Sequence, residues 1–234
     1  MALPALTPLE LEALRLSLRV GACSVAASLP LGLAAAFLLA RGRFPGKLLV
    51  DGLIHLPLVL PPVVVGFALL VLFGRHGPIG AFLYEHFAIS FAFNWKGAAL
   101  ASAVMGFPLM VRAMRLSLEL VDRRLEQAAR TLGAGRLRVL VTVTLPLMAP
   151  GILSGVILAF ARSISEFGAT ITFVSNIPGE TSTLPLALYT LTQVPGGSAG
   201  AFRLALLSVA LAMAALVVSE LLARRLGRRI RGVA

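Results

Sequence analysis

Two side chains of opposite charge, Arg162 and Glu166, stand four residues apart in an otherwise apolar stretch of the chain. On a helix this spacing puts both side chains on one face. Charges inside apolar segments are costly, so they tend to face a polar cavity or each other. Two interpretations follow, and both stay open. Either the pair lies beside a pathway for an anion, which Arg162 attracts while Glu166 tempers the charge, or it is a self-neutralising pair that fixes helix packing.

The sequence offers no residues for nucleotide or metal chemistry. The segment from Gly42 to Lys47 reads Gly-x-x-x-Gly-Lys, which is one residue shorter than a phosphate-binding loop, and no Ser or Thr follows the lysine. The three histidines show no metal-ligand spacing, and no Ser/His/Asp set is evident. We therefore expect this chain to bind no cofactor and no metal and to be no enzyme.

The bulk composition places the chain in a membrane. It is 58% hydrophobic and 13% charged over 234 residues, with a mean hydropathy of +0.93. No soluble domain of this size needs so much apolar surface. The net charge of +11 could suggest nucleic acid, but most basic residues flank apolar runs and no aromatic-interleaved basic patch exists. We expect an integral membrane protein in contact with lipid, not nucleic acid, with residues 1–234 forming a single transmembrane domain.

Five apolar stretches are long enough to cross a bilayer, which takes about 20 residues in a helix. They are residues 14–40, 48–73, 97–116, 147–168 and 203–223. Prolines and glycines inside them are tolerated in a helix bundle, where neighbouring groups can satisfy the freed backbone. The predicted fold class is an all-α integral membrane protein with about five transmembrane helices.

The basic residues predict the orientation of these helices, because cytoplasmic loops are rich in Lys and Arg. Fifteen of the 21 basic residues lie in three places: the turn at 41–47, the segment 112–138 and the tail 224–231. The alternate loops hold only Arg75 and Lys96 in one case and none at 175–200. We expect the N-terminus outside and the C-terminus in the cytoplasm. Arg15 and Arg19 weakly oppose this orientation, although on a helix both can reach an interface.

The two loops on the outer side are each expected to carry a short helix. Residues 74–95 contain Tyr84, Phe87, Phe91, Phe93 and Trp95 and are predicted to form an interfacial helix with aromatic anchors. Residues 172–198 are rich in turn-forming residues, and 184–192 could form a short re-entrant helix.

A basic, amphipathic segment at 122–150 separates the third and fourth apolar stretches. Read as a helix, it has one apolar face, which consists of Leu125, Ala128, Ala129 and Leu132. Asp122 can cap its start, and Gly133 can supply the left-handed residue that ends it. We expect a second short helix from Arg136 that ends at Pro146 and Pro150, because prolines lack the backbone donor. Such a helix pair is too small to fold alone and must dock on something.

This segment resembles the EAA loop of membrane permease subunits in bacterial ABC importers. The matching order is Gln127-Ala128-Ala129, then Gly133, then Val-x-Leu145-Pro146 at 143–146. The family's leading Glu is Gln127 here, with Glu126 just before it. The resemblance implies that residues 117–145 form a cytoplasmic coupling loop that docks on an ATPase subunit. The candidate coupling residues are Leu125, Glu126, Gln127, Ala128, Ala129, Leu132, Gly133, Leu145 and Pro146. The alternative is an amphipathic helix on the membrane surface.

Three further segments resemble the molybdate-type permease within the sulfate/molybdate group of importers. They are residues 55–66, 107–115 and 161–181. The resemblance implies a homodimer in the bacterial cytoplasmic membrane, two ABC ATPase subunits that bind ATP and Mg, and an extracytoplasmic oxyanion-binding protein. A pathway for molybdate or tungstate needs few strong ligands, since tight binding would slow release. Ser163, Ser165 and Thr170 are candidate donors beside Arg162 and Glu166.

Three alternatives remain at this point. A permease for sulfate or another oxyanion would share the group's motifs. A secondary transporter would be expected to show inverted repeats or paired buried acids, and neither is visible. A membrane anchor that scaffolds cytoplasmic enzymes would have no need for buried charges such as Arg162 and Glu166.

Overall fold

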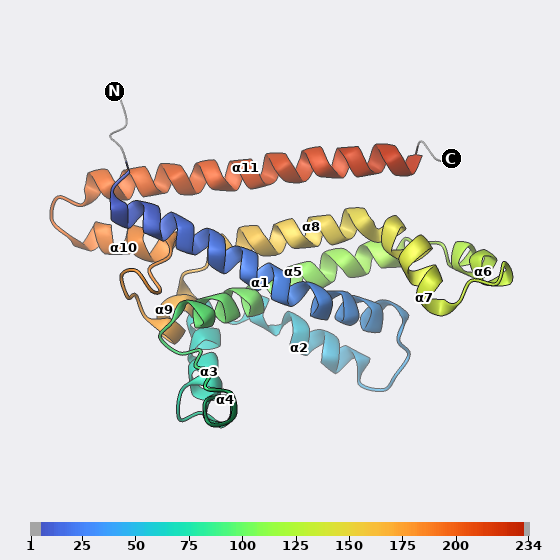
Figure 1. The fold of residues 1–234 in the computed structure, drawn as a ribbon, viewed down its shortest axis with the longest axis horizontal. Helices are drawn as coiled ribbons and strands as arrows, with labels where there is room; N and C mark the ends of the chain where they lie inside the picture. The colour runs from blue at the N-terminus through green and yellow to red at the C-terminus, as the bar shows by residue number, and fades with distance from the viewer. Residues whose placement is uncertain (1–5, 232–234) are drawn as a thin grey trace.

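The protein is a bundle of helices, shown in Figure 1. The computed structural model describes residues 6–231, and in the last helix it describes side chains up to residue 215 and at 217, 218 and 221. Every regular element within residues 6–231 is helical. The four longest helices are α1 (Pro8–Arg41), α5 (Trp95–Glu119), α8 (Leu145–Ile164) and α11 (Ser198–Arg231). The prediction of an all-α fold is confirmed.

Helices α1, α5 and α8 pack side by side and form the centre of the molecule (Figure 1). Glycines permit this close approach, as is common between membrane helices. A Cβ added to Gly155 of α8 would lie 3.0 Å from the Met110 carbonyl oxygen of α5, and one added to Gly106 would lie 3.1 Å from the Ala159 carbonyl oxygen. Met110, Met114 and Met148 fill the remaining space as fully buried side chains. The α5–α8 pair is therefore packed backbone against backbone.

The second predicted span is not one helix. It consists of α2 (Lys47–Val59) and α3 (Pro62–Phe73), which meet at an angle of 115°. Pro61 and Pro62 lack N–H donors, and a residue before proline is driven to extended backbone. Leu60 is extended, with φ −70° and ψ 143°. Four helices long and apolar enough to cross a membrane are therefore present in the described part of the chain, or five if the bent pair counts as one span.

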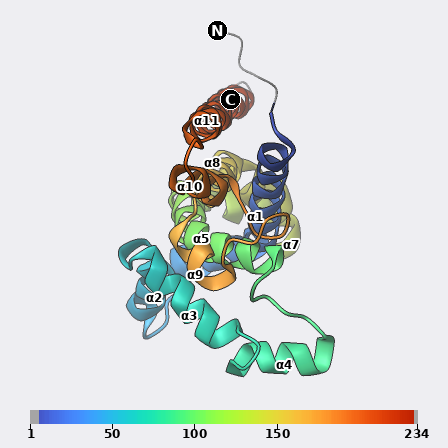
Figure 2. The ribbon, with the colours of Figure 1, turned by 90° about the vertical axis from the view of Figure 1, so that its left-hand side faces the viewer.

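The aromatic loop after α3 contains the expected short helix, α4 (Pro78–Phe87). Figure 2 shows α3 and α4 extending away from the central helices. Phe82, Tyr84 and Phe87 are exposed on α4. Trp95 instead begins α5, where the guanidinium of Arg19 lies 3.7 Å from the centre of its ring. This cation–π contact gives Arg19 a partner at the end of the molecule opposite the basic segments.

The basic segment folds as α6 (Arg123–Thr131), α7 (Arg136–Val139) and the π-helical turn η1 (Leu140–Thr144), which runs into α8. The prediction that Pro146 and Pro150 end the second helix is wrong, because residues from Arg136 to Ile164 form one continuous helical rod. The N–H of Leu145 donates to the carbonyl of Leu140, five residues earlier. This wider turn carries the helix past Pro146, which has no N–H to place.

The remaining short helices are α9 (Gly168–Val174) and α10 (Leu184–Gln193). The latter agrees with the expected helix at 184–192. Helices α9 and α10 lie at one end of the molecule and α6 and α7 at the other, and the two termini also lie at opposite ends (Figure 1). The arginine side chains of the tail, 224–231, lie outside the described side chains.

Candidate functional site

The amphipathic helix α6 has the ends that its sequence predicts. The Asp122 carboxylate accepts a hydrogen bond of 2.9 Å from the N–H of Arg124, which caps the helix. Gly133 has a φ of +85° and takes the left-handed conformation after the helix. Leu125 is 49% exposed and Leu132 88% exposed. The apolar face of α6 is thus left largely uncovered by the described residues.

The Glu126 carboxylate turns back toward the bundle. Its Oε1 accepts hydrogen bonds from Arg41 Nη2 at 3.2 Å and from Thr144 Oγ1 at 2.9 Å. The same Arg41 nitrogen lies 3.5 Å from the carbonyl of Leu118. Glu126 therefore joins α6 to the end of α1 and to η1, and through Arg41 to the end of α5. Gln127, the next residue, is exposed.

The other coupling candidates divide between solvent and bundle. Ala128 is exposed and Ala129 is half-buried. Leu145 packs against the cluster of Met114, Leu118 and Met148, whereas Pro146 at the start of α8 is exposed. The predicted set therefore has an outward half, centred on Leu125 and Leu132, and an inward half, centred on Glu126 and Leu145.

Arg162 and Glu166 form the expected ion pair, with 2.6 Å between Arg162 Nη1 and Glu166 Oε2. Glu166 does not sit on the helix, however, because α8 ends at Ile164. It lies in the break between α8 and α9, where its Oε1 accepts a 2.8 Å hydrogen bond from the N–H of Ala169. The Glu166 side chain is 1% exposed and that of Arg162 is 25% exposed. One carboxylate thus neutralises an arginine and caps α9.

The three hydroxyl candidates near this pair are in different surroundings. Ser163 is buried and accepts a 3.1 Å hydrogen bond from Ser24 of α1. Thr170 is also buried. Ser165 is exposed, donates to the Arg162 carbonyl, and lines a cavity of about 430 Å³ between α8, α10 and α11.

The α8–α9 break packs against the α2–α3 break. A Cβ added to Gly66 of α3 would lie 2.5 Å from the carbonyl oxygen of Ala169, and one added to Gly168 would lie 2.9 Å from Pro62 Cβ. Real Cβ atoms essentially never come closer than 3.0 Å to such a neighbour. The two interruptions are therefore locked together by glycine contacts, which the hydropathy pattern does not predict.

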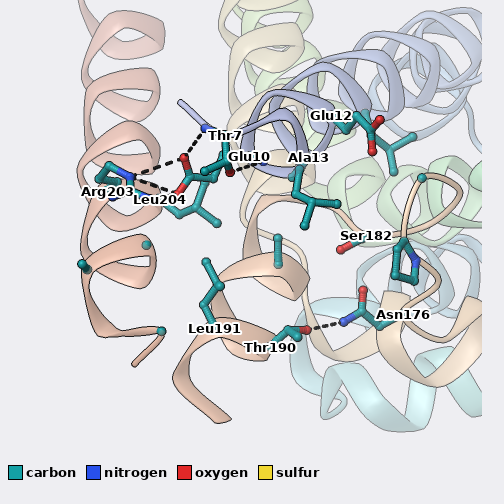
Figure 3. A pocket seen from close by; sticks show the side chains of 18 of the residues that line it. Thr7, Glu10, Glu12, Ala13, Asn176, Ser182, Thr190, Leu191, Arg203 and Leu204 are labelled. Carbon is teal, nitrogen blue, oxygen red and sulfur yellow. Dashed lines mark hydrogen bonds and ion pairs between the residues drawn. The ribbon is translucent and has the colours of Figure 1, made fainter. Parts of the chain in front are cut away.

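A second buried ion pair lies at the α10 end of the molecule. Arg203 of α11 donates from Nη2 to Glu10 Oε1 at 2.7 Å and from Nε to the same oxygen at 3.1 Å. Glu10 also accepts from the N–H of Thr7 at 2.9 Å. The pair lies on the wall of a cavity of about 490 Å³, drawn in Figure 3. No local pattern could have predicted it, since 193 residues separate the partners.

The first half of α2 carries a third charged cluster. Asp51 pairs with Arg115 of α5 at 2.9 Å and lies 3.1 Å from His55 Nδ1, while Arg115 also binds Glu119. These contacts tie α2 to α5. Among the residues that the structure describes, no group of three His, Cys, Asp or Glu side chains could hold a metal ion.

Comparison with known proteins agrees with this geometry. The family described as "Binding-protein-dependent transport system inner membrane component" matches residues 28–232. The chain is 64% identical over 219 residues to the molybdenum transport system permease protein ModB of Escherichia coli (strain K12), covering 94% of this chain and 96% of that protein. It is 56% identical over 222 residues to ModB of Haemophilus influenzae, covering 95% and 97%. It is 39% identical over 223 residues to the sulfate transport system permease protein CysW of Synechococcus elongatus, covering 94% and 76%.

The fold is similar to a solved transporter. A chain in the crystal structure of a bacterial alginate ABC transporter, in complex with an alginate pentasaccharide-bound periplasmic protein, superposes with a TM-score of 0.71. The superposition covers 96% of this chain and 80% of that chain, at 18% sequence identity.

Proposed function

Because the chain belongs to the family of binding-protein-dependent transport system inner membrane components, we propose that it carries molybdate across the membrane for an ATP-driven importer. It is a multi-pass protein of the bacterial inner membrane and the permease subunit of an ABC importer, not an enzyme. Family membership sets aside the secondary transporter and the membrane anchor as alternatives.

The substrate assignment rests on one observation: 64% identity to a molybdenum permease over 94% of the chain. The sulfate permease CysW is more distant, at 39% identity. Tungstate has nearly the same size and charge as molybdate, and we propose that discrimination between them lies mainly in the extracytoplasmic binding protein.

Permeases of this class work with an ATPase and an extracytoplasmic binding protein. We propose that the permease is a homodimer and that two ATPase subunits, which hold the ATP and Mg, dock on α6 from the cytoplasm. The uncovered apolar face of α6, with Leu132 88% exposed, supports this docking site. In this orientation the N-terminus and helices α4, α9 and α10 face outward, where a binding protein delivers the substrate.

The proposed pathway runs past the two locked helix breaks. An oxyanion cannot cross hydrocarbon unaided, so its route must be polar and transiently open. Arg162 offers a partly exposed positive charge there, already balanced by Glu166, so an anion would be attracted without being held tightly. Ser165 is the accessible hydroxyl beside it. Ser163, Glu166 and Thr170 are buried here and would reach the route only if the breaks move apart.

Rigid packing supports a mechanical link between the two sites. The helical rod from Arg136 to Ile164 connects the α6 end to the α8–α9 break without interruption. A displacement of α6 by a closing ATPase would therefore move the Arg136 end of the rod. This movement would be transmitted along the rod and would strain the contact between Gly66 and Ala169. Packed helices that have two arrangements can turn such a displacement into opening and closing.

Growth under limiting molybdate tests the substrate assignment. A strain that lacks its own molybdate permease is complemented with this gene together with its partner genes, and molybdate uptake is measured with sulfate or tungstate as competitor. We expect tungstate to compete and an excess of sulfate to leave uptake unchanged. Strong competition by sulfate would contradict the assignment to molybdate.

A further inference from the structure

We propose that Glu126 is an internal positioning residue, which sets the angle of α6 on the bundle through Arg41 and Thr144, rather than a contact to the ATPase. This inference rests on the proposed function, since it concerns how an ATPase-driven movement of α6 reaches the transmembrane helices. It assigns to Arg41, at the end of α1, a part in coupling.

The contacts leave the Glu126 carboxylate little freedom to reach a partner. Oε1 accepts from both Arg41 Nη2 at 3.2 Å and Thr144 Oγ1 at 2.9 Å. The side chains of Arg41 and Glu126 are only 21% and 17% exposed. Hydrogen bonds to ionised groups are stronger than neutral ones, and partial burial shields them from salt. Oε1 of Glu126 is therefore held by groups of its own chain.

Little else fixes the orientation of α6. All nine of its residues are described, and none is buried. Short connections hold the helix at both ends, and the second one contains Gly133 at φ +85° and Gly135. Without the carboxylate contacts, α6 could pivot on these connections. A pivoting helix would absorb the partner's movement instead of transmitting it.

The helix dipoles of α1 and α6 favour the ion pair between Arg41 and Glu126. Arg41 lies in the last turn of α1 and Glu126 in the first turn of α6. Cations are stabilised at helix C-termini and anions at helix N-termini. Arg41 also faces the Leu118 carbonyl near the end of α5. Glu126, Arg41 and Thr144 therefore connect the start of α6 with the ends of α1 and α5 and with η1. Through these contacts α6 would move together with α1, α5 and α8.

The side chains left for the ATPase are the exposed ones. Leu125 and Leu132 are the apolar contacts, and Gln127 is the exposed polar residue at the position where the loop's usual glutamate would stand. The two neighbouring residues thus have different roles: Glu126 is bound to the helix bundle, and Gln127 faces the ATPase.

The experiment compares Glu126→Ala, Arg41→Ala and the double variant in the complete transporter, reconstituted in vesicles with its ATPase subunits and binding protein. Arg43→Ala is the matched control, because Arg43 is exposed in the same turn and forms no ion pair with a described residue. Three quantities are measured: ATPase subunits bound, ATP hydrolysed and molybdate imported.

We expect both single variants to keep the ATPase bound and to lower molybdate imported per ATP about tenfold, the size expected for a lost charge-assisted hydrogen bond. The double variant should be no worse than either single one, because the two residues act through one contact. Glu126→Gln keeps an acceptor for Thr144 and should recover part of the loss. Arg43→Ala should behave as the parent.

Several outcomes would overturn the proposal. Arg41→Ala could behave as the control, the losses of the two single variants could multiply, or Glu126→Ala alone could release the ATPase, which would place Glu126 in the partner contact. If the parent complex itself imports no molybdate, the proposed function fails and not the positioning role.

A second measurement covers variants that do not assemble. Trypsin digestion of the permease alone, in membranes, reports on α6 directly through its exposed residues Arg123, Arg124 and Arg130. We expect cleavage within α6 to be about tenfold faster in Glu126→Ala and Arg41→Ala than in the parent, because local opening exposes the backbone. Equal cleavage rates in all variants would contradict the positioning role without reference to transport.

Discussion

At the scale of single residues, buried and half-buried carboxylates determine how the helices of this permease are connected. Glu166 balances Arg162 and caps α9, Glu126 joins α6 to three other elements, and Glu10 joins the first helix to the last. Each lies in a poorly solvated place and has a basic partner and at least one further hydrogen bond. A charge left in such a place without its partner is strongly unfavourable. Removal of one partner therefore lowers the stability of the protein more than removal of both.

This rule gives a prediction for Arg162. The single variant Arg162→Ala leaves Glu166 1% exposed without its counter-charge, and we expect it to destabilise the protein by about 3 kcal/mol. The double variant Arg162→Ala/Glu166→Gln should recover much of this loss, because the neutral amide can still accept from Ala169. Thermal unfolding in detergent measures both.

The double variant also separates transport from packing. We expect it to bind the ATPase normally but to import molybdate more slowly than the parent, since the positive charge beside the pathway is gone. Unchanged uptake would mean that the pair only fixes helix packing.

The sequence points to Glu126 and Glu166 and predicts the partner of Glu166, but it does not predict the partner of Glu126 and does not single out Glu10. The EAA-like spacing points to Glu126 and Gln127, yet the direction of each side chain depends on Arg41, which lies 85 residues away. The i,i+4 spacing of Arg162 and Glu166 predicts their ion pair even though the helix ends between them, because the turn keeps the two side chains close.

At the scale of elements, the arrangement of the helices depends more on where they are broken than on how long they are. Hydropathy predicts where the apolar segments lie, but a proline can either be absorbed or break the helix. Several single prolines lie within continuous helices, namely Pro30, Pro57, Pro108 and Pro150. The adjacent pair Pro61-Pro62 removes two donors and forces Leu60 to be extended, and there the chain turns by 115°. Each proline leaves one backbone carbonyl without its usual N–H donor, and neighbouring groups can satisfy one such carbonyl more readily than two.

The contact between the two breaks yields a prediction at this scale. Gly66→Ala should push α3 away from α9, because the new Cβ would lie 2.5 Å from the Ala169 carbonyl oxygen. We expect destabilisation of about 1–3 kcal/mol and a loss of molybdate uptake with the ATPase still bound.

Gly52→Ala is the matched control for Gly66→Ala. A Cβ at Gly52 of α2 meets nothing within 4 Å, and alanine favours a helix over glycine. Gly52→Ala should keep full uptake and unchanged or slightly higher stability. Equal behaviour of the two variants would show that the α3–α9 contact has no special role.

The apolar face of α6 yields the second prediction for an element. Replacing Leu125 and Leu132 by Glu should prevent the ATPase from docking, because burying a carboxylate in an apolar interface without a partner is strongly unfavourable. Co-purification of the ATPase from membranes measures this. Leu125→Met/Leu132→Met, which keeps the face apolar, should bind as the parent does. An intact complex in the Glu variant would mean that these leucines do not face the ATPase.

At the scale of the whole molecule, we propose that the chain is a passive permease that its ATPase subunits move from one end. The basic helices α6 and α7 and the short helices α9 and α10 lie at opposite ends, joined by α1, α5 and the continuous rod that ends in α8 (Figures 1 and 2). The composition and the five apolar stretches already predict an integral membrane protein, and the resemblance of segment 122–150 to the EAA loop predicts a permease. The folding of the second stretch back onto α9, and the α1–α11 link through Glu10 and Arg203, depend on contacts between distant segments that no local pattern encodes.

The most direct test of this account is molybdate accumulation by the purified chain in sealed vesicles, measured with and without the ATPase subunits. With the ATPase subunits, ATP and the binding protein present, we expect molybdate to accumulate against its gradient. Without the ATPase subunits, we expect no accumulation of molybdate, whichever ion gradient is imposed across the vesicle membrane. Uphill accumulation by the permease alone would contradict the account.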